Sequence, residues 1–314
     1  MAGSKRQITL LAEANPEFVS TDYVNELTDR SLIYLKAGFP VHFRGPAGTG
    51  KSTLAKHLAS KLARPICLIH GDEQMTTANL VGGESGYSMR KVRDNFISSV
   101  LKEEESMTKK WVDNRLTQAC RNGYTLVYDE FTRSRPEANN VLLSVLQDRM
   151  LTIGNDMSGD SPYLEVSPEF RAIFTSNPEE YAGTHKSQDA LRDRMVTIDI
   201  DYPDYITEVQ ILRSKSELPL DSCELISKIV RTLRESGECE FSPTIRGGIM
   251  IAKTLAQINI LPEDNVPLFT QFCQDILASE TSRLGKKSNQ NRVKDLVRSI
   301  VRENVSRFTT SVAS

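Results

Sequence analysis

The sequence predicts an α/β fold, in which a mostly parallel sheet with covering helices carries a phosphate-binding loop, followed by an all-helical domain. A glycine-rich motif over residues 45–52 stands between an apolar, strand-like run and a helix-patterned stretch. Short β-rich runs alternate with helical patterns up to about residue 202, as in parallel sheets whose strands are joined by helices. Beyond Pro203 only helical periodicity remains.

The motif over residues 45–52 has the spacing G-x-x-x-x-G-K-[ST] of a phosphate-binding loop. Glycines let the backbone curl so that successive N–H groups face an anion, while the lysine reaches the β- and γ-phosphates and the last hydroxyl binds Mg²⁺. The following helix pattern ends at Arg64-Pro65. We therefore expect ATP to be bound by Gly45, Pro46, Ala47, Gly48, Thr49, Gly50, Lys51 and Ser52.

The elements around this loop follow from apolar runs and the residues that interrupt them. Residues 22–36 have helical periodicity and are followed by Gly38 and Pro40, which stop the helix. The polar, glycine-rich stretch 71–87 is expected to contribute nothing to the core. Strands are expected at residues 41–43, 66–70, 125–128, 172–175 and 196–200. Because parallel strands collect ligands at their carboxyl ends, the loop and the polar strand ends should share one edge.

The division of the chain follows from the same patterns. We expect an N-terminal tail over residues 1–20, an α/β nucleotide-binding domain over 21–202 and a helical lid domain over 203–314. The segment from Arg283 to Arg307 has eight lysines and arginines against two acidic residues. Its apolar face is expected to pack on the helical domain with its charges solvated, although a basic amphipathic helix can also bind a membrane surface or an acidic partner.

Composition limits the classes of function. A formal net charge of −2 with 25% charged residues gives no global reason for nucleic acid or anionic membrane to be the main partner. The five cysteines are scattered and the four histidines lack metal-ligand spacing, which favours buried, reduced thiols and argues against a zinc site. The first residues of the sequence lack the apolar core of 7–15 residues expected of a signal peptide, and no segment approaches 18 consecutive apolar residues. We expect a cytoplasmic protein.

Acidic and amide side chains follow two of the expected strands. Asp129 and Glu130 come directly after an apolar run, and Asn177 follows another. Asp129 can hold Mg²⁺ together with Ser52, and Glu130 is then placed to polarise the attacking water, which the Asn177 amide can orient. The alternatives are an exposed acidic pair at a strand end and a turn-forming asparagine before a proline.

Arginines supply the remaining requirement for hydrolysis, because negative charge builds on the γ-phosphate oxygens as the bond breaks. Arg192 and Arg194 lie just before the last expected strand, and Arg246 lies in the helical domain. An arginine donated by a neighbouring subunit would imply a ring. For any one of the three, the sequence alone favours a solvated surface residue.

Taken together, these residues resemble an AAA+ ATPase, and longer stretches resemble its MoxR-like branch. The MoxR-like stretches include Asp129-Glu130-Phe131-Thr132-Arg133 and Thr175-Ser176-Asn177-Pro178. Within that branch the chain is similar to the GvpN family of gas vesicle proteins over about residues 20–250. The stretches that carry this similarity are Gly71-Asp72-Glu73-Gln74-Met75-Thr76-Thr77, Trp111-Val112-Asp113-Asn114-Arg115-Leu116 and residues 128–140.

The resemblance implies roles position by position. It makes residues 45–52 the Walker A loop, Asp129 and Glu130 the Walker B pair, and Asn177 sensor 1. It makes Arg246 the sensor 2 arginine and Arg194 the arginine finger, a role for which the nearby Arg192 competes. Two departures weaken the match: Thr132 replaces the family's asparagine, and the sensor 2 Ser-Pro-Arg appears as Ser242-Pro243-Thr244-Ile245-Arg246.

The resemblance also implies a function: Mg²⁺-dependent ATP hydrolysis that assists gas vesicle assembly by remodelling protein complexes. It implies a homo-oligomer, a hexameric ring, with other gas vesicle proteins as partners, located in the cytoplasm and in association with the vesicle. The stretch 71–93 and a hairpin over 151–166 are candidate partner surfaces. Two alternatives stay open: a nucleotide-binding structural component of the vesicle with little turnover, and a DNA-acting AAA+ protein.

Overall fold

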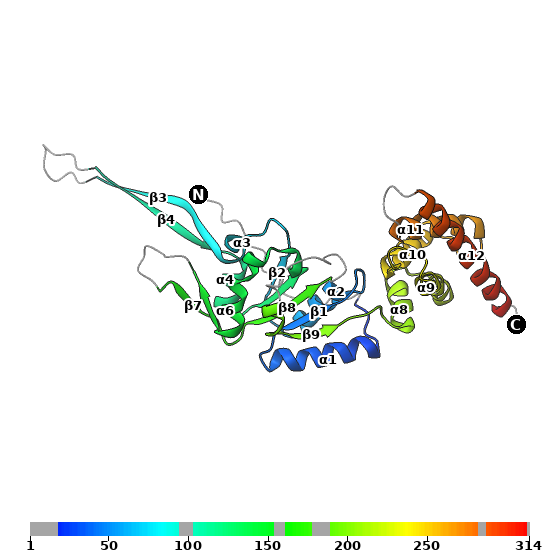
Figure 1. Cartoon of the computed structure of the whole chain (residues 1–314), viewed down its shortest axis with the longest axis horizontal. Coiled ribbons are helices and arrows are strands. Elements are labelled where there is room, and N and C mark those ends of the chain that lie inside the picture. The colour runs from blue at the N-terminus through cyan, green and yellow to red at the C-terminus, as the bar shows by residue number, and fades with distance from the viewer. Residues whose placement is uncertain (1–17, 94–102, 154–160, 178–188, 282–286, 313–314) are drawn as a thin grey trace. The chain divides into compact units, whose positions relative to one another are not determined.

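The structure is a computed structural model that describes residues 18–93, 103–153, 161–177, 189–281 and 287–312 (Figure 1). The described chain divides into two compact units. The sheet unit comprises Ser31–Arg44 and Ser52–Asp199, and the helical unit comprises residues 18–30, Gly45–Lys51 and the chain from Ile200 onward. The expected N-terminal tail lies almost entirely outside the described residues.

A five-stranded parallel sheet forms the centre of the sheet unit. Its strand order is β2-β5-β8-β1-β9, and every neighbouring pair is parallel, as predicted. The strands are β1 (Val41–Arg44), β2 (Ile66–His70), β5 (Thr125–Asp129), β8 (Arg171–Ser176) and β9 (Val196–Asp199). They were recognisable because strands covered on both faces are almost continuously apolar; all five residues of β5 are buried.

Helices connect the strands of this unit. Before the first strand comes α1 (Asp22–Lys36), which has the predicted bounds and whose residues up to Arg30 belong to the helical unit; α2 (Lys51–Lys61) follows the phosphate loop. The others are α3 (Thr77–Val81), α4 (Arg115–Asn122), the 3-10 turn η1 (Phe131–Arg133), α5 (Pro136–Asn139), α6 (Val141–Gln147) and α7 (Asp189–Arg192). Part of the core beneath them is aromatic: the ring of Phe131 meets those of Phe174 and His42 edge-on.

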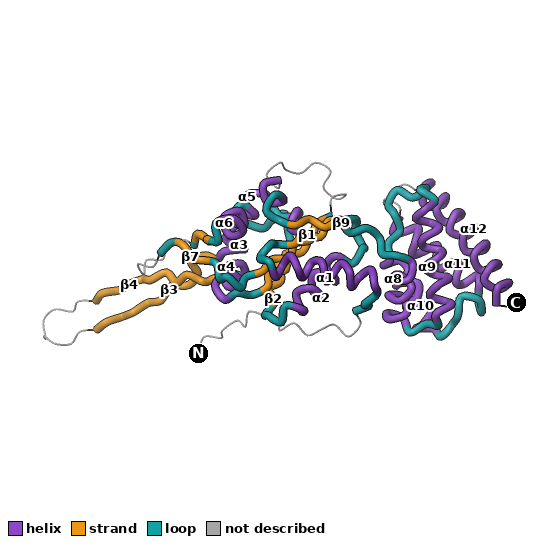
Figure 2. Tube along the Cα trace, turned by 90° about the horizontal axis from the view of Figure 1, so that it is seen from below, coloured by secondary structure: helices purple, strands orange, loops and turns teal. Residues whose placement is uncertain are grey.

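The prediction that residues 71–87 contribute nothing to the core is wrong. Leu80 and Val81 of α3 are buried and pack with α4, because this short helix brings two apolar residues beneath an otherwise polar segment. Residues 82–93 are also a strand, β3 (Gly82–Arg93), which pairs antiparallel with β4 (Glu103–Asp113). The two form a long ribbon that projects from the sheet unit (Figures 1 and 2).

A shorter hairpin appears where the sequence predicted one. Strand β6 (Met150–Thr152) pairs antiparallel with β7 (Tyr163–Glu165), which confirms the hairpin expected over residues 151–166. The turn around Gly154 and Gly159 lies outside the described residues. Both this hairpin and the β3–β4 ribbon are separate two-stranded sheets.

Most of the described helical unit consists of five helices that pack side by side (Figure 2). They are α8 (Tyr205–Ser216), α9 (Leu220–Glu235), α10 (Ile245–Ile258), α11 (Val266–Thr281) and α12 (Lys287–Val312). Val293, Val297 and Val301 of α12 are buried in the shared core, so the apolar face of the basic C-terminal helix packs as predicted. Its lysines and arginines pair mainly with exposed acidic residues of α11 and α12, as Lys294 does with Asp275.

Two general features agree with the composition. All five cysteines are free thiols, and all but Cys239 are buried, where loss of hydration raises the pKa of Cys67 to about 11. Within the described ranges, we find no helix with the length and apolar character needed to cross a membrane.

A buried ion pair in the helical unit gives the first prediction. Glu208 of α8 is 2% exposed and accepts from Arg234 at 2.8 Å, with Arg231 and Ser227 at longer range. Glu208→Gln leaves the mostly buried Arg234 without its counter-charge, so the free energy of unfolding should fall by about 3–5 kcal/mol. Glu303→Gln, which breaks the exposed Arg307–Glu303 pair, should cost less than about 0.5 kcal/mol. Urea denaturation of both variants is the measurement, and equal losses would contradict the prediction.

Candidate functional site

The phosphate loop joins β1 to α2 and has the backbone that anion binding requires. Gly48 and Gly50 have φ values of 74° and 89°, a region that side chains disfavour and glycine adopts freely. Because α2 begins at Lys51, the loop ends at a helix N-terminus, where unpaired N–H groups favour negative charge. The Lys51 ammonium donates to the Pro46 carbonyl at 2.5 Å, which holds the lysine over the loop.

Ser52 and Asp129 come together at the carboxyl edge of the sheet. The Ser52 hydroxyl donates to Asp129 Oδ1 at 2.6 Å, although 77 residues separate them in sequence. Asp129 is the last residue of β5 and is 7% exposed, so its charge is largely shielded from water. A hydroxyl beside a carboxylate is a hard-oxygen donor set that fits Mg²⁺.

Glu130 follows Asp129 in a left-handed backbone conformation, with φ at 51°. For a residue other than glycine this costs about 1–3 kcal/mol and persists only where the surroundings impose it. The Glu130 carboxylate is 43% exposed and accepts from Arg133 at 2.6 Å. Since both partners are exposed, this ion pair contributes little stability, and it leaves the carboxylate able to move.

Asn177 follows β8 and is almost completely buried, at the strand end nearest to Glu130. The preceding residue, Ser176, has its hydroxyl 2.8 Å from His42 Nε2, and His42 Nδ1 lies 3.1 Å from the Thr197 hydroxyl. The imidazole therefore links three neighbouring strands, β8, β1 and β9. Burial, with help from the charge of Arg192, lowers the pKa of His42 to about 3, so the ring is neutral and can donate to one hydroxyl and accept from the other.

The two candidate finger arginines lie in different environments. Arg194 donates through Nε and Nη2 to the Gln147 side chain of α6, at 2.8 and 2.5 Å, and through Nη1 to the Ala190 carbonyl. Arg192 ends α7, and its charge reaches His42 inside the same unit. The finger role stays a prediction for both.

Arg246 lies in the first turn of α10, in the helical unit. Thr244 caps this helix by accepting from the Arg246 backbone N–H at 3.1 Å. Glu280 of α11 in turn accepts from the Thr244 backbone N–H at 3.1 Å and from its hydroxyl. The Arg246 side chain is exposed, which suits a residue that acts on a ligand, and its sensor role stays a prediction.

Sequence reasoning missed several residues that build this site. Thr175 contacts Asp129 and Glu130, and His42 contacts Ser176 next to Asn177, but these partners lie in distant parts of the sequence. Gly71 is a third: a Cβ there would lie 2.0 Å from the Glu130 carbonyl oxygen, so only glycine fits. A glycine directly after a strand, at the edge where ligands gather, is a local signal that could have identified Gly71.

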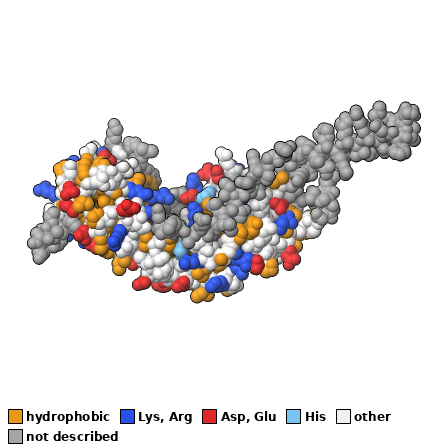
Figure 3. Space-filling model, turned by 180° about the vertical axis from the view of Figure 1, so that it is seen from behind, with side chains coloured by type: hydrophobic (Ala, Val, Ile, Leu, Met, Phe, Trp, Pro, Cys, Tyr) orange, Lys and Arg blue, Asp and Glu red, His pale blue; other side chains and the backbone are white. Residues whose placement is uncertain are grey.

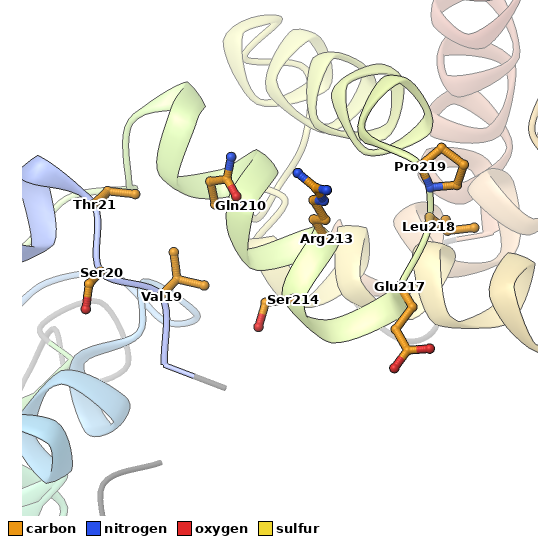
Figure 4. Close-up of a pocket in the computed structure, with 9 residues that line it drawn as sticks. All are labelled: Val19, Ser20, Thr21, Gln210, Arg213, Ser214, Glu217, Leu218 and Pro219. Carbon is orange, nitrogen blue, oxygen red and sulfur yellow. The ribbon is translucent and has the colours of Figure 1, made fainter. Parts of the chain in front are cut away.

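A separate pocket lies in the helical unit, between the segment before α1 and the second half of α8 (Figure 4). Figure 4 shows Val19 and Thr21 on one side and the side chains of Gln210 and Arg213 on the other. Its lining residues are Val19, Ser20, Thr21, Gln210, Arg213, Ser214, Glu217, Leu218 and Pro219. Since none of these is a predicted site residue, the pocket carries none of the chemistry described above.

Comparisons with known proteins agree with this arrangement. The family model described as AAA domain (dynein-related subfamily) matches residues 40–195. The gas vesicle ATPase GvpN of Ancylobacter aquaticus is 51% identical over 262 residues, which cover 83% of this chain and 73% of that protein. The gas vesicle ATPase GvpN of Haloferax mediterranei is 38% identical over 300 residues, covering 95% and 84%. Among solved structures, the RuvB Holliday junction branch migration motor of Thermotoga maritima has a TM-score of 0.50 at 16% identity, covering 83% of this chain and 72% of that one, which is a likeness of fold alone.

The close approach at Gly71 gives a prediction about turnover. Gly71→Ala places a methyl group against the Glu130 carbonyl and must displace the strained backbone there. Small misplacements at a reacting centre are costly, so kcat for ATP should fall about tenfold or more. Gly83→Ala is the matched control, because a Cβ at Gly83 meets nothing within 4 Å. A Gly71→Ala protein that is folded by circular dichroism and has unchanged kcat would contradict this prediction.

The buried imidazole gives a prediction about pH. Folded His42 stays neutral down to about pH 3, whereas an unfolded histidine binds a proton near pH 6.5. The unfolded state therefore binds more protons in this window, and His42 makes the free energy of unfolding decrease by about 1.4 kcal/mol per unit as the pH falls. His42→Gln should remove this contribution, so the slope of unfolding free energy between pH 6 and pH 4 should become shallower by about that amount. Parallel slopes for the two proteins would show that the ring is not held neutral.

Proposed function

Because the chain belongs to the GvpN family of gas vesicle ATPases, we propose that it uses ATP hydrolysis to remodel protein complexes during gas vesicle assembly. The chain is an AAA ATPase of the MoxR-like type. The observation that carries the proposal is the Ser52–Asp129 hydrogen bond with Glu130 directly beside it. A protein that only binds nucleotide needs the phosphate loop, but it does not need an acidic pair arranged around that loop's last hydroxyl.

The proposal gives each site residue a role. Residues 45–51 hold the phosphates, with Lys51 countering the charge of the β- and γ-phosphates. Ser52 and Asp129 would hold Mg²⁺, which neutralises charge on the same phosphates when it is bound. Glu130 accepts a proton from the attacking water, and the Asn177 amide orients that water. The exposed pairing of Glu130 with Arg133 leaves the carboxylate free to turn toward the water.

We further propose that the active form is a homo-oligomer, a hexameric ring, in which Arg194 or Arg192 acts on ATP bound by a neighbour and Arg246 acts within its own chain. Arg194 supports this proposal because its guanidinium is fixed on Gln147 by two hydrogen bonds, which would hold it in a single direction. The partners would be other gas vesicle proteins. The location would be the cytoplasm, in association with the vesicle.

Surface charge supports a protein partner over DNA. On the face that Figure 3 shows, lysine and arginine side chains of the described residues are interspersed with aspartate and glutamate. Duplex DNA is usually bound by a concentrated basic face, because most of its affinity comes from phosphate contacts. Salt-sensitive binding of duplex DNA by the purified protein would favour the DNA-acting alternative.

Two variants separate binding from turnover. Lys51→Ala should lose ATP affinity, because the phosphates lose their main counter-charge. Glu130→Gln should bind ATP normally but lose turnover by about a hundredfold or more, because the amide cannot accept the proton. Glu137→Gln, a nearby exposed acid, is the control and should keep full turnover. Binding is measured with a fluorescent ATP analogue and turnover by phosphate release.

The same variants test the role in the cell. Each is expressed in a vesicle-forming cell that lacks its own copy of the gene, and buoyant vesicles are scored. The proposal expects both Lys51→Ala and Glu130→Gln to abolish vesicles. If Glu130→Gln supported vesicles while Lys51→Ala did not, the chain would be a nucleotide-binding structural component instead. Normal vesicles with both variants would remove the assembly role and leave the ATPase.

A further inference from the structure

One buried hydroxyl contacts both acidic residues of the site. Thr175 lies near the end of β8, two residues before Asn177, and is 1% exposed. Its Oγ1 donates to Asp129 Oδ1 at 2.5 Å and accepts from the Glu130 backbone N–H at 2.9 Å. A hydroxyl has one hydrogen and two acceptor lone pairs, so it can make both bonds at once.

We propose that Thr175 is a positioning residue for ATP hydrolysis, which fixes the Asp129 carboxylate and the Glu130 backbone relative to β8, the strand that Asn177 follows. The inference rests on the proposed hydrolytic function and names a residue that function requires. Thr175 is not expected to touch ATP or water itself. It acts through the two acidic residues.

The effect on Asp129 comes from the number of donors at one oxygen. Oδ1 receives hydrogen bonds from both Ser52 and Thr175, while Oδ2 lies 3.5 Å from His70 Nδ1. Two hydroxyl donors, one from a helix and one from a strand, fix the rotation of the carboxylate. A metal-holding carboxylate whose rotation is fixed needs no reorganisation when Mg²⁺ arrives.

Thr175 affects Glu130 because Glu130 lies just past the last backbone pair between β5 and β8. The β5–β8 pairing ends at Tyr128 and Phe174, so the Glu130 N–H lies beyond it. The Thr175 side chain takes the place of the next backbone acceptor and holds Glu130 in its left-handed conformation. The strain at Glu130 therefore persists because a partly buried hydrogen bond opposes its release.

Thr175 is also held by β1, the strand that pairs with β8 on the side opposite to β5. It lies in register with Phe43 of β1, and the next residue, Ser176, is hydrogen-bonded to His42. The hydroxyl on β8 therefore bonds to β5, and its own strand is paired with β1. If only strand packing were required, valine would fit the same space, because it has the same branching at Cβ.

The test compares variants that separate the hydroxyl from the shape of the side chain. Thr175→Val keeps the shape and removes both hydrogen bonds, and Thr175→Ser keeps the hydroxyl. On the full chain, Thr175→Val should lower kcat about ten- to a hundredfold, with ATP affinity changed by less than about threefold. It should also raise the Mg²⁺ concentration needed for half-maximal turnover. Thr175→Ser should restore most of kcat.

Thr117→Val is the control for buried hydroxyls in general. Thr117 of α4 is buried and donates to the Val81 carbonyl at 2.6 Å, away from the acidic pair. The variant should lose stability but keep kcat and the Mg²⁺ requirement. If Thr175→Val does not fold, Thr175→Cys, a smaller change with a weak donor, should give an intermediate loss of kcat.

Three results would overturn the inference. They are wild-type kcat and Mg²⁺ requirement in Thr175→Val, equal losses in Thr175→Val and Thr175→Ser, and a loss of kcat in Thr117→Val as large as in Thr175→Val. In each case the proposed function stands if the wild-type chain hydrolyses ATP and Glu130→Gln does not. If the wild-type chain shows no turnover above Glu130→Gln, it is the proposed function that fails, and the inference fails with it.

Discussion

The candidate site depends on the burial of one charge, the carboxylate of Asp129. A carboxylate that is largely withdrawn from water must be fully hydrogen-bonded or it destabilises the fold. Here a single oxygen accepts from hydroxyls on α2 and β8, so the requirement to satisfy the charge also fixes the helix after the phosphate loop and the strand before Asn177. The strand order makes this possible, because β8 lies between β5 and β1.

Backbone strain at Glu130 is the second constraint, and it depends on the first. Thr175 holds the Glu130 N–H, and Gly71 leaves room for the Glu130 carbonyl. The Glu130 side chain, in contrast, has one exposed ionic partner. The backbone is therefore fixed while the carboxylate can rotate, which is the combination that a residue needs when it must meet a water molecule whose position is set by ATP.

How far the sequence predicts this arrangement depends on the range of the interactions. The five sheet strands and α1 were predictable because burial on both faces or on one helical face leaves a local pattern, as in Ile66–His70. The β3 strand was not predictable, because its glycines and charged residues leave no alternation of apolar and polar side chains. The same holds in the site: the phosphate loop is a local motif, whereas Thr175 and His42 act through contacts 46 and 134 residues away. Such partners are set by strand order, which one sequence does not reveal.

In the helical unit, the position of Arg246 also depends on a chain of hydrogen bonds. Its helix is capped by Thr244, and Thr244 donates to Glu280 of the neighbouring α11. Burial is the main cause that raises the pKa of the Glu280 carboxyl. The first turn of α10 is thus attached to a second helix and, through the common core, to the remaining three. The Arg246 backbone is therefore tied to this bundle by partly exposed hydrogen bonds through Thr244 and Glu280. If Arg246 acts on ATP as proposed, a displacement of its helix would be passed through Thr244 and Glu280 to the core that the five helices share.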